Sequence, residues 1–158
     1  MRILYICTHN RCRSILSEAI TNQLGAKQNI IAKSAGSQPV GEVHPLSLKH
    51  LSLHGIETKG LESQSWHEFD TFQPDLVITV CDSAAQESCP VYFTKTNQLH
   101  WGLRDPSKMI GTEAEVSAAF EQCIDTIKQR VNKIIALKMS GLSASAIKAE
   151  IQGMTCDD

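Results

Sequence analysis

The sequence predicts an α/β fold, a single domain in which helices flank a parallel sheet. Short apolar segments alternate along the chain with segments whose apolar residues recur every three or four positions. Residues 75–80 are apolar almost throughout, which is typical of a parallel strand buried on both faces. Strands that alternate with helices in this way indicate parallel connections between the strands.

Each element follows from a local pattern. Short β-branched and apolar runs predict strands, and helical spacing of apolar residues predicts helices. Pro45 in the first turn of one such segment and Gly55 after its end are typical helix boundaries. The expected strands are residues 2–6, 29–35, 75–80 and 98–101, and the expected helices are residues 14–24, 45–54, 112–140 and 143–152, with loop and short helix between 82 and 96.

The longest expected helix begins at Thr112. Thr112 and Glu115 form a capping-box signature, and apolar residues follow at spacings of three and four. Acidic side chains occur in its early turns and basic side chains in its later turns, which is the order that complements a helix dipole. Gly141 is the expected end of this helix.

The length and charge limit the organisation and the class of partner. A chain of 158 residues fits one domain, so we expect residues 1–140 to form it and residues 141–158 to add a short helix and a frayed tail. The formal charge of −2 mixes both signs, with no basic block for nucleic acid or an anionic membrane. The first apolar run is too short for a signal peptide or a membrane span, which predicts a cytoplasmic location.

Six cysteines point to thiol chemistry. In a reducing cytoplasm, nucleophilic, redox or metal-binding roles are favoured over static disulfides. Zinc binding is the weakest of these interpretations, because no pair among the four cysteines of the first two thirds of the chain has the two-residue separation of zinc knuckles. The cysteines are Cys7, Cys12, Cys81, Cys89, Cys123 and Cys156.

The loop between the first strand and the first helix carries the main chemical signal. Amides at a helix N-terminus can surround a tetrahedral oxyanion, and Arg13, with five residues between it and Cys7, can hold two of its oxygens. The same positive field is expected to lower the pKa of Cys7, with Ser14 donating a hydrogen bond to the thiolate. A buried cysteine beside a solvated arginine explains the spacing equally well, but the position between strand and helix favours a nucleophile. The candidate substrate-binding residues are Thr8, His9, Asn10, Arg11, Cys12, Arg13 and Ser14.

Asp105 is the candidate general acid. Asp105-Pro106 follows the expected last strand and supplies a carboxylate on a loop, where it could protonate a departing oxygen. An Asp-Pro pair alone is a common turn starter, so this role depends on its pairing with the cysteine loop.

These motifs resemble the low-molecular-weight phosphotyrosine phosphatase-like family and, within it, the thioredoxin-coupled arsenate reductases. The resemblance covers residues 1 to about 137. It implies a four-stranded parallel sheet flanked by helices, with Cys7 as nucleophile, Arg13 as oxyanion clamp, Asp105 as acid and Asn10 shaping the loop. The motifs are residues 7–14, Ser34-Ala35-Gly36, Val80-Cys81, Cys89-Pro90, His100-Trp101-Gly102 and Asp105-Pro106, all in the family's order.

The resemblance also implies a choice between two reactions. In the resembling reductases one cysteine binds arsenate, a second expels arsenite and a third resolves the disulfide; here these roles fall on Cys7, Cys81 and Cys89. The expected electron donor is thioredoxin, with glutaredoxin or glutathione as alternatives, and phosphate or sulfate would compete with arsenate. The alternative is a tyrosine phosphatase, although Ser107 stands where such enzymes usually have tyrosine. A third possibility is an oxyanion-binding module without catalysis.

Some positions depart from the family pattern. His9 replaces a glycine and Arg11 a small residue, which makes the rim of the loop bulkier and more cationic. Some resembling reductases bind potassium beside the loop. Asn10 and Glu18 match that site, but Trp66 stands where those enzymes have an aspartate. The chain is expected to hold no bound cofactor.

Overall fold

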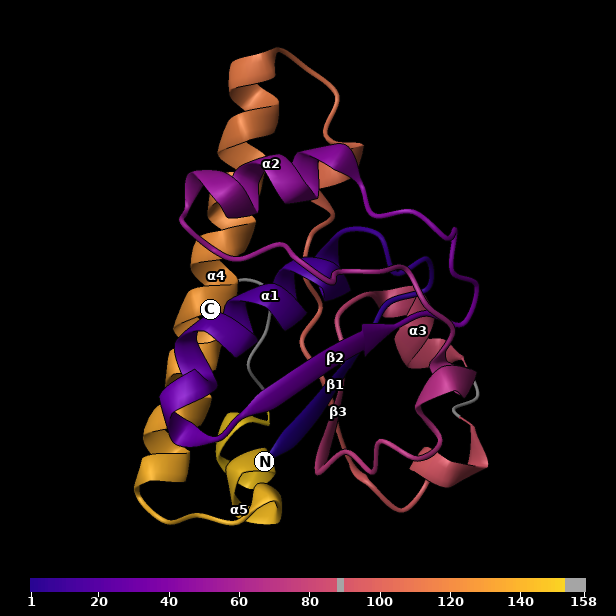
Figure 1. Cartoon of the computed structure of the whole chain (residues 1–158), viewed down its shortest axis with the longest axis vertical. Coiled ribbons are helices and arrows are strands. Elements are labelled where there is room, and N and C mark those ends of the chain that lie inside the picture. Colours follow the sequence, from indigo (N-terminus) through magenta and orange to yellow (C-terminus); the bar gives the residue numbers. More distant parts are fainter. Residues whose placement is uncertain (88–89, 153–158) are drawn as a thin grey trace.

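The computed structural model describes residues 1–87 and 90–152, apart from the side chain of Tyr92. The predictions that concern Cys89, Cys156 and the tail 153–158 therefore lie outside the described residues. Four parallel strands form one sheet in the order β2-β1-β3-β4, which confirms the predicted fold (Figure 1). The strands are β1 (Arg2–Ile6), β2 (Ile31–Ala35), β3 (Leu76–Thr79) and β4 (Asn97–His100).

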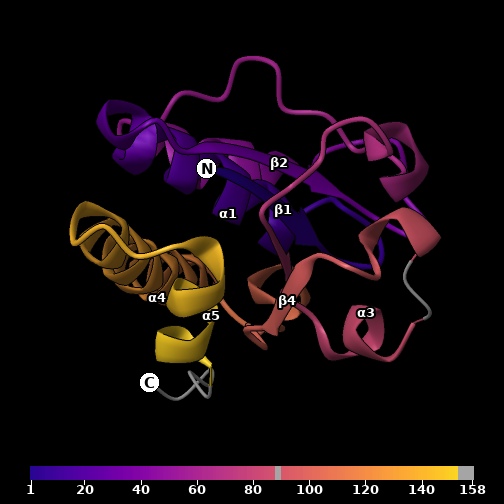
Figure 2. The ribbon, with the colours of Figure 1, turned by 90° about the horizontal axis from the view of Figure 1, so that it is seen from below.

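All the predicted helices are present within the described chain. In the view of Figure 2, α1, α4 and α5 lie to one side of the sheet and α3 to the other. The short 3₁₀ helix Trp66–Phe69, which is capped by Ser65 and Glu68, was not predicted. The helices are α1 (Arg13–Gly25), α2 (Pro45–Leu53), α3 (Asp82–Gln86), α4 (Glu113–Met139) and α5 (Ala144–Ile151), with further 3₁₀ segments at Ala26–Gln28, Val91–Phe93 and Pro106–Lys108.

One boundary differs for a local reason. The second strand was expected from residue 29, but it begins at Ile31. Asn29 has a φ of 56°, in the left-handed region, and its N–H bonds to the carbonyl of Ala26. Asparagine tolerates this conformation, so the chain ends a helical turn there before the strand begins.

The register of the sheet brings three loops to one edge. β1 is one of the two inner strands, and its residues from Ile3 to Ile6 are fully buried. Ile6 pairs with Ala35 on one side and with Thr79 on the other. Parallel strands that end level place their following residues together. The residues after β1, β2 and β3 therefore meet at the carboxyl edge of the sheet.

Helix α4 closes one face of the fold. The predicted capping box forms, with the amide of Glu115 donating to Thr112 Oγ1 at 3.2 Å. The apolar stripe of α4 is buried, and α4 packs along α1. Ile147 and Ile151 of α5 are also buried, against α4 and β4, so α5 shares the core. The domain boundary at residue 140 stays a prediction.

None of the helices in the described chain combines the length and the apolar character that crossing a membrane requires.

Candidate active site

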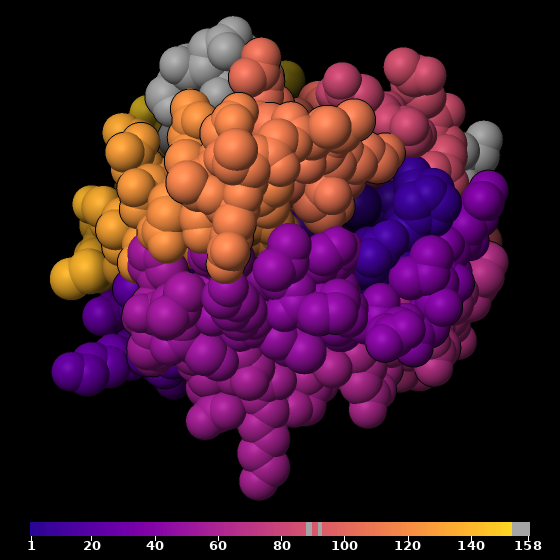
Figure 3. All heavy atoms as spheres, turned by 90° about the horizontal axis from the view of Figure 1, so that it is seen from above, coloured from indigo at the N-terminus to yellow at the C-terminus, as the bar shows by residue number. Residues whose placement is uncertain are grey.

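The loop between β1 and α1 forms the floor of a pocket at the carboxyl edge of the sheet. Figure 3 shows this loop in indigo, at the bottom of a hollow between the segment after β4 in orange and the segment after β2 in purple. The pocket has a volume of about 160 Å³. The structure thus brings together four of the five predicted catalytic residues. The lining residues are Cys7, Thr8, His9, Arg11, Cys12, Arg13, Cys81, Ser83, Asp105, Ser107 and Lys108.

Asn10 fixes the shape of the loop from beneath. It is fully buried with a φ of 47°, and its Nδ2 donates to Ser14 Oγ at 2.8 Å and to Ser34 Oγ at 2.9 Å. Its Oδ1 accepts from the amide of Gln64 at 2.7 Å. In residues 1–87 and 90–152, no hydrogen bond from Ser14 to Cys7 is found. The Ser14 hydroxyl accepts from Asn10 Nδ2 and keeps its own hydrogen, so its expected donation to the Cys7 sulfur stays a prediction.

Gly36 allows the loop to pack against the end of β2. A Cβ atom at this position would lie 2.5 Å from the carbonyl oxygen of Thr8 and 2.9 Å from that of Cys7. Such contacts are too short for any side chain, so only glycine fits. This close approach explains why the Ser34-Ala35-Gly36 motif accompanies the cysteine loop.

Arg13 is held at the start of α1 by groups from the segment after β4. Its Nη1 donates to the carbonyl of Leu103 at 3.0 Å, and its Nη2 lies 3.4 Å from Asp105 Oδ2. Its Nε is buried and has no hydrogen-bond partner among the described residues. Two contacts therefore orient the guanidinium and leave a donor for an oxyanion.

Asp105 is oriented by its own turn. It caps the 3₁₀ helix Pro106–Lys108, and its Oδ1 accepts from Ser107 N at 3.0 Å and from Ser107 Oγ at 2.6 Å. Pro106 suits the first position of this turn because its missing N–H would have no partner there. The turn role and the acid role of Asp105 are thus compatible, since its second oxygen remains in the pocket beside Arg13.

Cys7 and Cys81 follow the paired strands β1 and β3 and line the same pocket. Cys81 Sγ accepts from the amides of Thr8 and Ala84, each at 3.4 Å. The interaction between the two thiols raises the pKa of Cys7 above its ordinary value and lowers the pKa of Cys81 below its own. Burial raises the pKa of Cys7 further, whereas Arg13 acts in the opposite direction.

The prediction that the loop lowers the pKa of Cys7 is therefore wrong for this arrangement. The positive field of the loop and of Arg13 is present, but two backbone amides favour the negative charge on Cys81. Both cysteines are buried, and neither is in a disulfide. Because the two thiols interact, their titrations are coupled.

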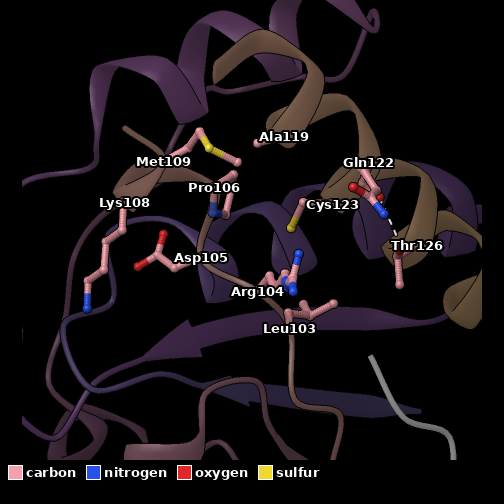
Figure 4. Close-up of a pocket in the computed structure, with 10 residues that line it drawn as sticks. All are labelled: Leu103, Arg104, Asp105, Pro106, Lys108, Met109, Ala119, Gln122, Cys123 and Thr126. Atoms are coloured by element: carbon pink, nitrogen blue, oxygen red, sulfur yellow. Dashed lines mark hydrogen bonds between the residues drawn. The ribbon is translucent and has the colours of Figure 1, made fainter. Parts of the chain in front are cut away.

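Two further cysteines are buried without entering this pair. Burial raises the pKa of Cys12 to about 12 and also raises that of Cys123. Cys123 lies on α4, as predicted, and faces a second hollow of about 330 Å³ that adjoins the first along Asp105 (Figure 4). A protonated thiol is a poor nucleophile, so neither Cys12 nor Cys123 is suited to attack a bound oxyanion.

The residues that match a potassium site do not fit this ion here. Ser34 Oγ links Asn10 to Glu18, donating to Glu18 Oε1 at 2.7 Å. The oxygen of Asn10 is taken by the amide of Gln64, and Trp66 has no oxygen in its side chain. Hard cations need several oxygen ligands. Within the described residues, no three His, Cys, Asp or Glu side chains are grouped as metal ligands.

The comparisons with known proteins agree with this geometry. The family model for low molecular weight phosphotyrosine protein phosphatases matches residues 2–150, and the chain belongs to this family. Its sequence is 34% identical over 132 residues to an arsenate reductase of Bacillus licheniformis, which covers 83% of this chain and 92% of that protein. An arsenate reductase of Bacillus subtilis is 33% identical over 132 residues, with the same coverage.

Solved structures of arsenate reductases share the fold. One in a phosphate-binding state superposes with a TM-score of 0.71 and 26% identity, over 85% of this chain and 96% of that chain. A thioredoxin-dependent arsenate reductase from Corynebacterium glutamicum gives a TM-score of 0.66 and 26% identity, over 88% of this chain and 62% of that chain. The residues that line the pocket all lie within residues 2–150, the part of the chain that the family model matches.

The sequence analysis missed two contributors to the site. The carbonyl of Leu103 holds Arg13, and Glu87 accepts a hydrogen bond of 2.9 Å from Thr8 Oγ1. Backbone carbonyls carry no signal in a sequence, and Glu87 lies far from Thr8 along the chain. Only the capping preference of Asp-Pro-Ser could have predicted the contact between Ser107 and Asp105.

Proposed function

We propose that the chain reduces arsenate to arsenite through a cysteine relay and receives its electrons from thioredoxin. The observation that carries this proposal is that Cys7 and Cys81 line the same pocket, where two backbone amides donate to Cys81 Sγ. Hydrolysis of a phosphoryl group needs only one cysteine. Reduction needs a second sulfur within reach of the first, and this pocket contains one.

The first step joins arsenic to Cys7. The loop amides and Arg13 hold the tetrahedral oxyanion. Two features support this role: the buried Nε of Arg13 is available as a donor, and the amides at the start of α1 point toward the loop. The Cys7 thiolate attacks arsenic while the shared proton lies on Cys81. One oxygen leaves as water with a proton from Asp105, whose carboxyl group lies beside Arg13. Arsenic remains As(V) in the resulting thioester of arsenate.

The second step transfers the electrons. Once Cys7 is bonded to arsenic, Cys81 releases its proton to the solvent, and its thiolate attacks the sulfur of Cys7 to form a Cys7–Cys81 disulfide. The bond between Cys7 and arsenic breaks, and its electron pair stays on arsenic, which leaves as arsenite. Two thiols are oxidised and As(V) is reduced to As(III). The amides of Thr8 and Ala84 favour the thiolate that this step requires on Cys81.

The third step regenerates Cys7. Cys89 would attack Cys81, move the disulfide to Cys81–Cys89 and release the Cys7 thiolate. Cys89 lies outside the described residues, so its role rests on the sequence and on the resemblance. The dithiol of thioredoxin would then reduce the disulfide. One structural relative is a thioredoxin-dependent arsenate reductase, which supports thioredoxin over glutaredoxin or glutathione.

Three further expectations accompany this function. Phosphate and sulfate should compete with arsenate, because the pocket recognises a tetrahedral oxyanion. A cytoplasmic location suits a relay that needs reduced thiols. Potassium is not part of the proposal, because the residues near Glu18 do not supply a suitable set of oxygens.

The test is turnover with arsenate, thioredoxin, thioredoxin reductase and NADPH. We expect NADPH consumption by the unchanged protein and none by Cys7→Ser, Cys81→Ser or Cys89→Ser. Cys123→Ser is the matched control and should keep its activity, because that cysteine lies on α4 outside the relay. Full multiple turnover by Cys81→Ser would refute the relay. Fast hydrolysis of an aryl phosphate without arsenate reduction would select the phosphatase alternative.

A further inference from the structure

The hydroxyl group of Thr8 lies between Cys81 and Glu87. Thr8 Oγ1 donates to Glu87 Oε1 at 2.9 Å, and the same oxygen lies 3.6 Å from Cys81 Sγ. The amide of Thr8 donates to this sulfur at 3.4 Å. In the described part of the chain, Cys81 and Glu87 are the side-chain partners of this hydroxyl.

A hydroxyl group has one hydrogen to donate and two lone pairs to accept with. The carboxylate of Glu87 is the closer and the more strongly accepting of the two partners, so it takes the hydrogen. A lone pair of Thr8 then faces Cys81. The lone pair of the Thr8 oxygen repels a thiolate at Cys81, whereas it can accept a hydrogen bond from a Cys81 thiol.

We propose that Glu87, acting through the Thr8 hydroxyl, sets which of the two sulfurs, Cys7 or Cys81, carries the negative charge. Two backbone amides favour charge on Cys81. The Thr8 hydroxyl would be a third donor to Cys81, but Glu87 accepts its hydrogen. Glu87 thereby favours the proton on Cys81 and the thiolate on Cys7. Glu87 is thus a positioning residue for the first step of the proposed reduction. The role of Glu87 in catalysis therefore rests on the proposed function.

Other charged groups lie around the sulfur pair and remain unchanged in the experiment. Arg13 from α1 and Asp105 from the segment after β4 line the same pocket. Asp82, which follows Cys81, is hydrogen bonded to His100 of β4 at 2.9 Å. These contacts do not involve the Thr8 hydroxyl, so a change at Glu87 leaves them in place, and the Thr8→Val background separates the effect of the hydroxyl from that of the lost charge.

The experiment measures how limiting iodoacetamide divides between Cys7 and Cys81, by peptide mass spectrometry at pH 7. In Glu87→Ala, the hydroxyl is free to donate to Cys81, and we expect the ratio of Cys7 to Cys81 labelling to fall about tenfold. Glu87→Gln keeps an oxygen acceptor and should restore most of the ratio. Glu150→Ala, an exposed change of the same charge on α5, should leave it unaltered.

A double substitution separates this inference from a general structural effect. In a Thr8→Val background there is no hydroxyl to compete for, so Glu87→Ala should change the ratio no further. An unchanged ratio in Glu87→Ala alone, or an equal fall in the Thr8→Val background, would overturn the proposal. The assay uses neither arsenate nor thioredoxin, so its outcome is distinct from a failure of the proposed reductase activity.

Discussion

Arg13 and Asp105 form an ion pair inside the pocket, with 3.4 Å between Nη2 and Oδ2. Both side chains are 15% exposed, so the pair is only partly screened by water. Arg13 comes from the N-terminus of α1, and Asp105 comes from the segment after β4. This contact joins the residue proposed to bind the oxyanion to the residue proposed to protonate its leaving oxygen.

Asp105→Asn should slow the first chemical step. Asparagine keeps the shape of the turn but cannot donate the proton of an acid, and loss of general acid catalysis typically costs about 10²- to 10⁴-fold in rate. Single-turnover arsenate reduction measures this step. Ser107→Ala, which removes the 2.6 Å contact to Asp105 Oδ1, should cost about tenfold by loosening the carboxylate. An Asp105→Asn protein with unaltered single-turnover rates would rule out the acid role.

Arg11→Ser should weaken oxyanion binding. Arg11 lines the pocket, and its buried Nε has no hydrogen-bond partner among the described residues. Loss of a charge-assisted contact should weaken phosphate binding about tenfold, as measured by titration calorimetry. Arg2→Ser is the control, because Arg2 is exposed at the start of β1, at the opposite end of the strand. Equal losses in the two variants would indicate only a change of net charge.

Gly36→Ala should displace the loop. The added Cβ would meet the carbonyl of Thr8 at 2.5 Å, so we expect a loss of about 2 kcal/mol in the free energy of unfolding and a large loss of phosphate affinity. In Gly41→Ala the added Cβ would contact nothing within 4 Å, although the φ of 85° strains the backbone. This control should lose about 1 kcal/mol and keep its affinity. Similar phosphate affinities in both variants would contradict the close packing at Gly36.

Glu18 should make the protein less stable as the pH rises. Burial raises the pKa of this carboxyl group, against the effect of the hydrogen bond from Ser34. Because the folded state then binds the proton more tightly than the unfolded state, stability falls as the pH rises from the unfolded value, near 4.5, through the raised folded value. Urea unfolding at several pH values measures this.

Glu18→Gln removes the titration and is the matched variant. It should resemble the unchanged protein at low pH and become the more stable of the two towards pH 7. A difference in unfolding free energy that stays constant over this range would show that the buried carboxyl group does not titrate as proposed.

Much of the fold follows from local patterns. The capping box of Thr112 and Glu115 predicted the start of α4, and the strand-loop-helix order placed Cys7 before the start of α1. The capping box and the helical pattern depend on residues three or four positions apart, so both can be recognised in the sequence alone. The 3₁₀ helix Trp66–Phe69 was missed, although its Ser65 and Glu68 form a similar box, because no apolar periodicity follows it.

The sequence by itself determined the elements, the parallel sheet and the residues of the oxyanion loop, because these follow from short-range spacing. The tertiary structure alone decided which groups act on the two sulfurs. Cys81 reaches Cys7 only through the parallel register of β1 and β3, and the donors that act on it come from Thr8 and Ala84. A pKa depends on distances to groups remote in sequence, and folding fixes those distances.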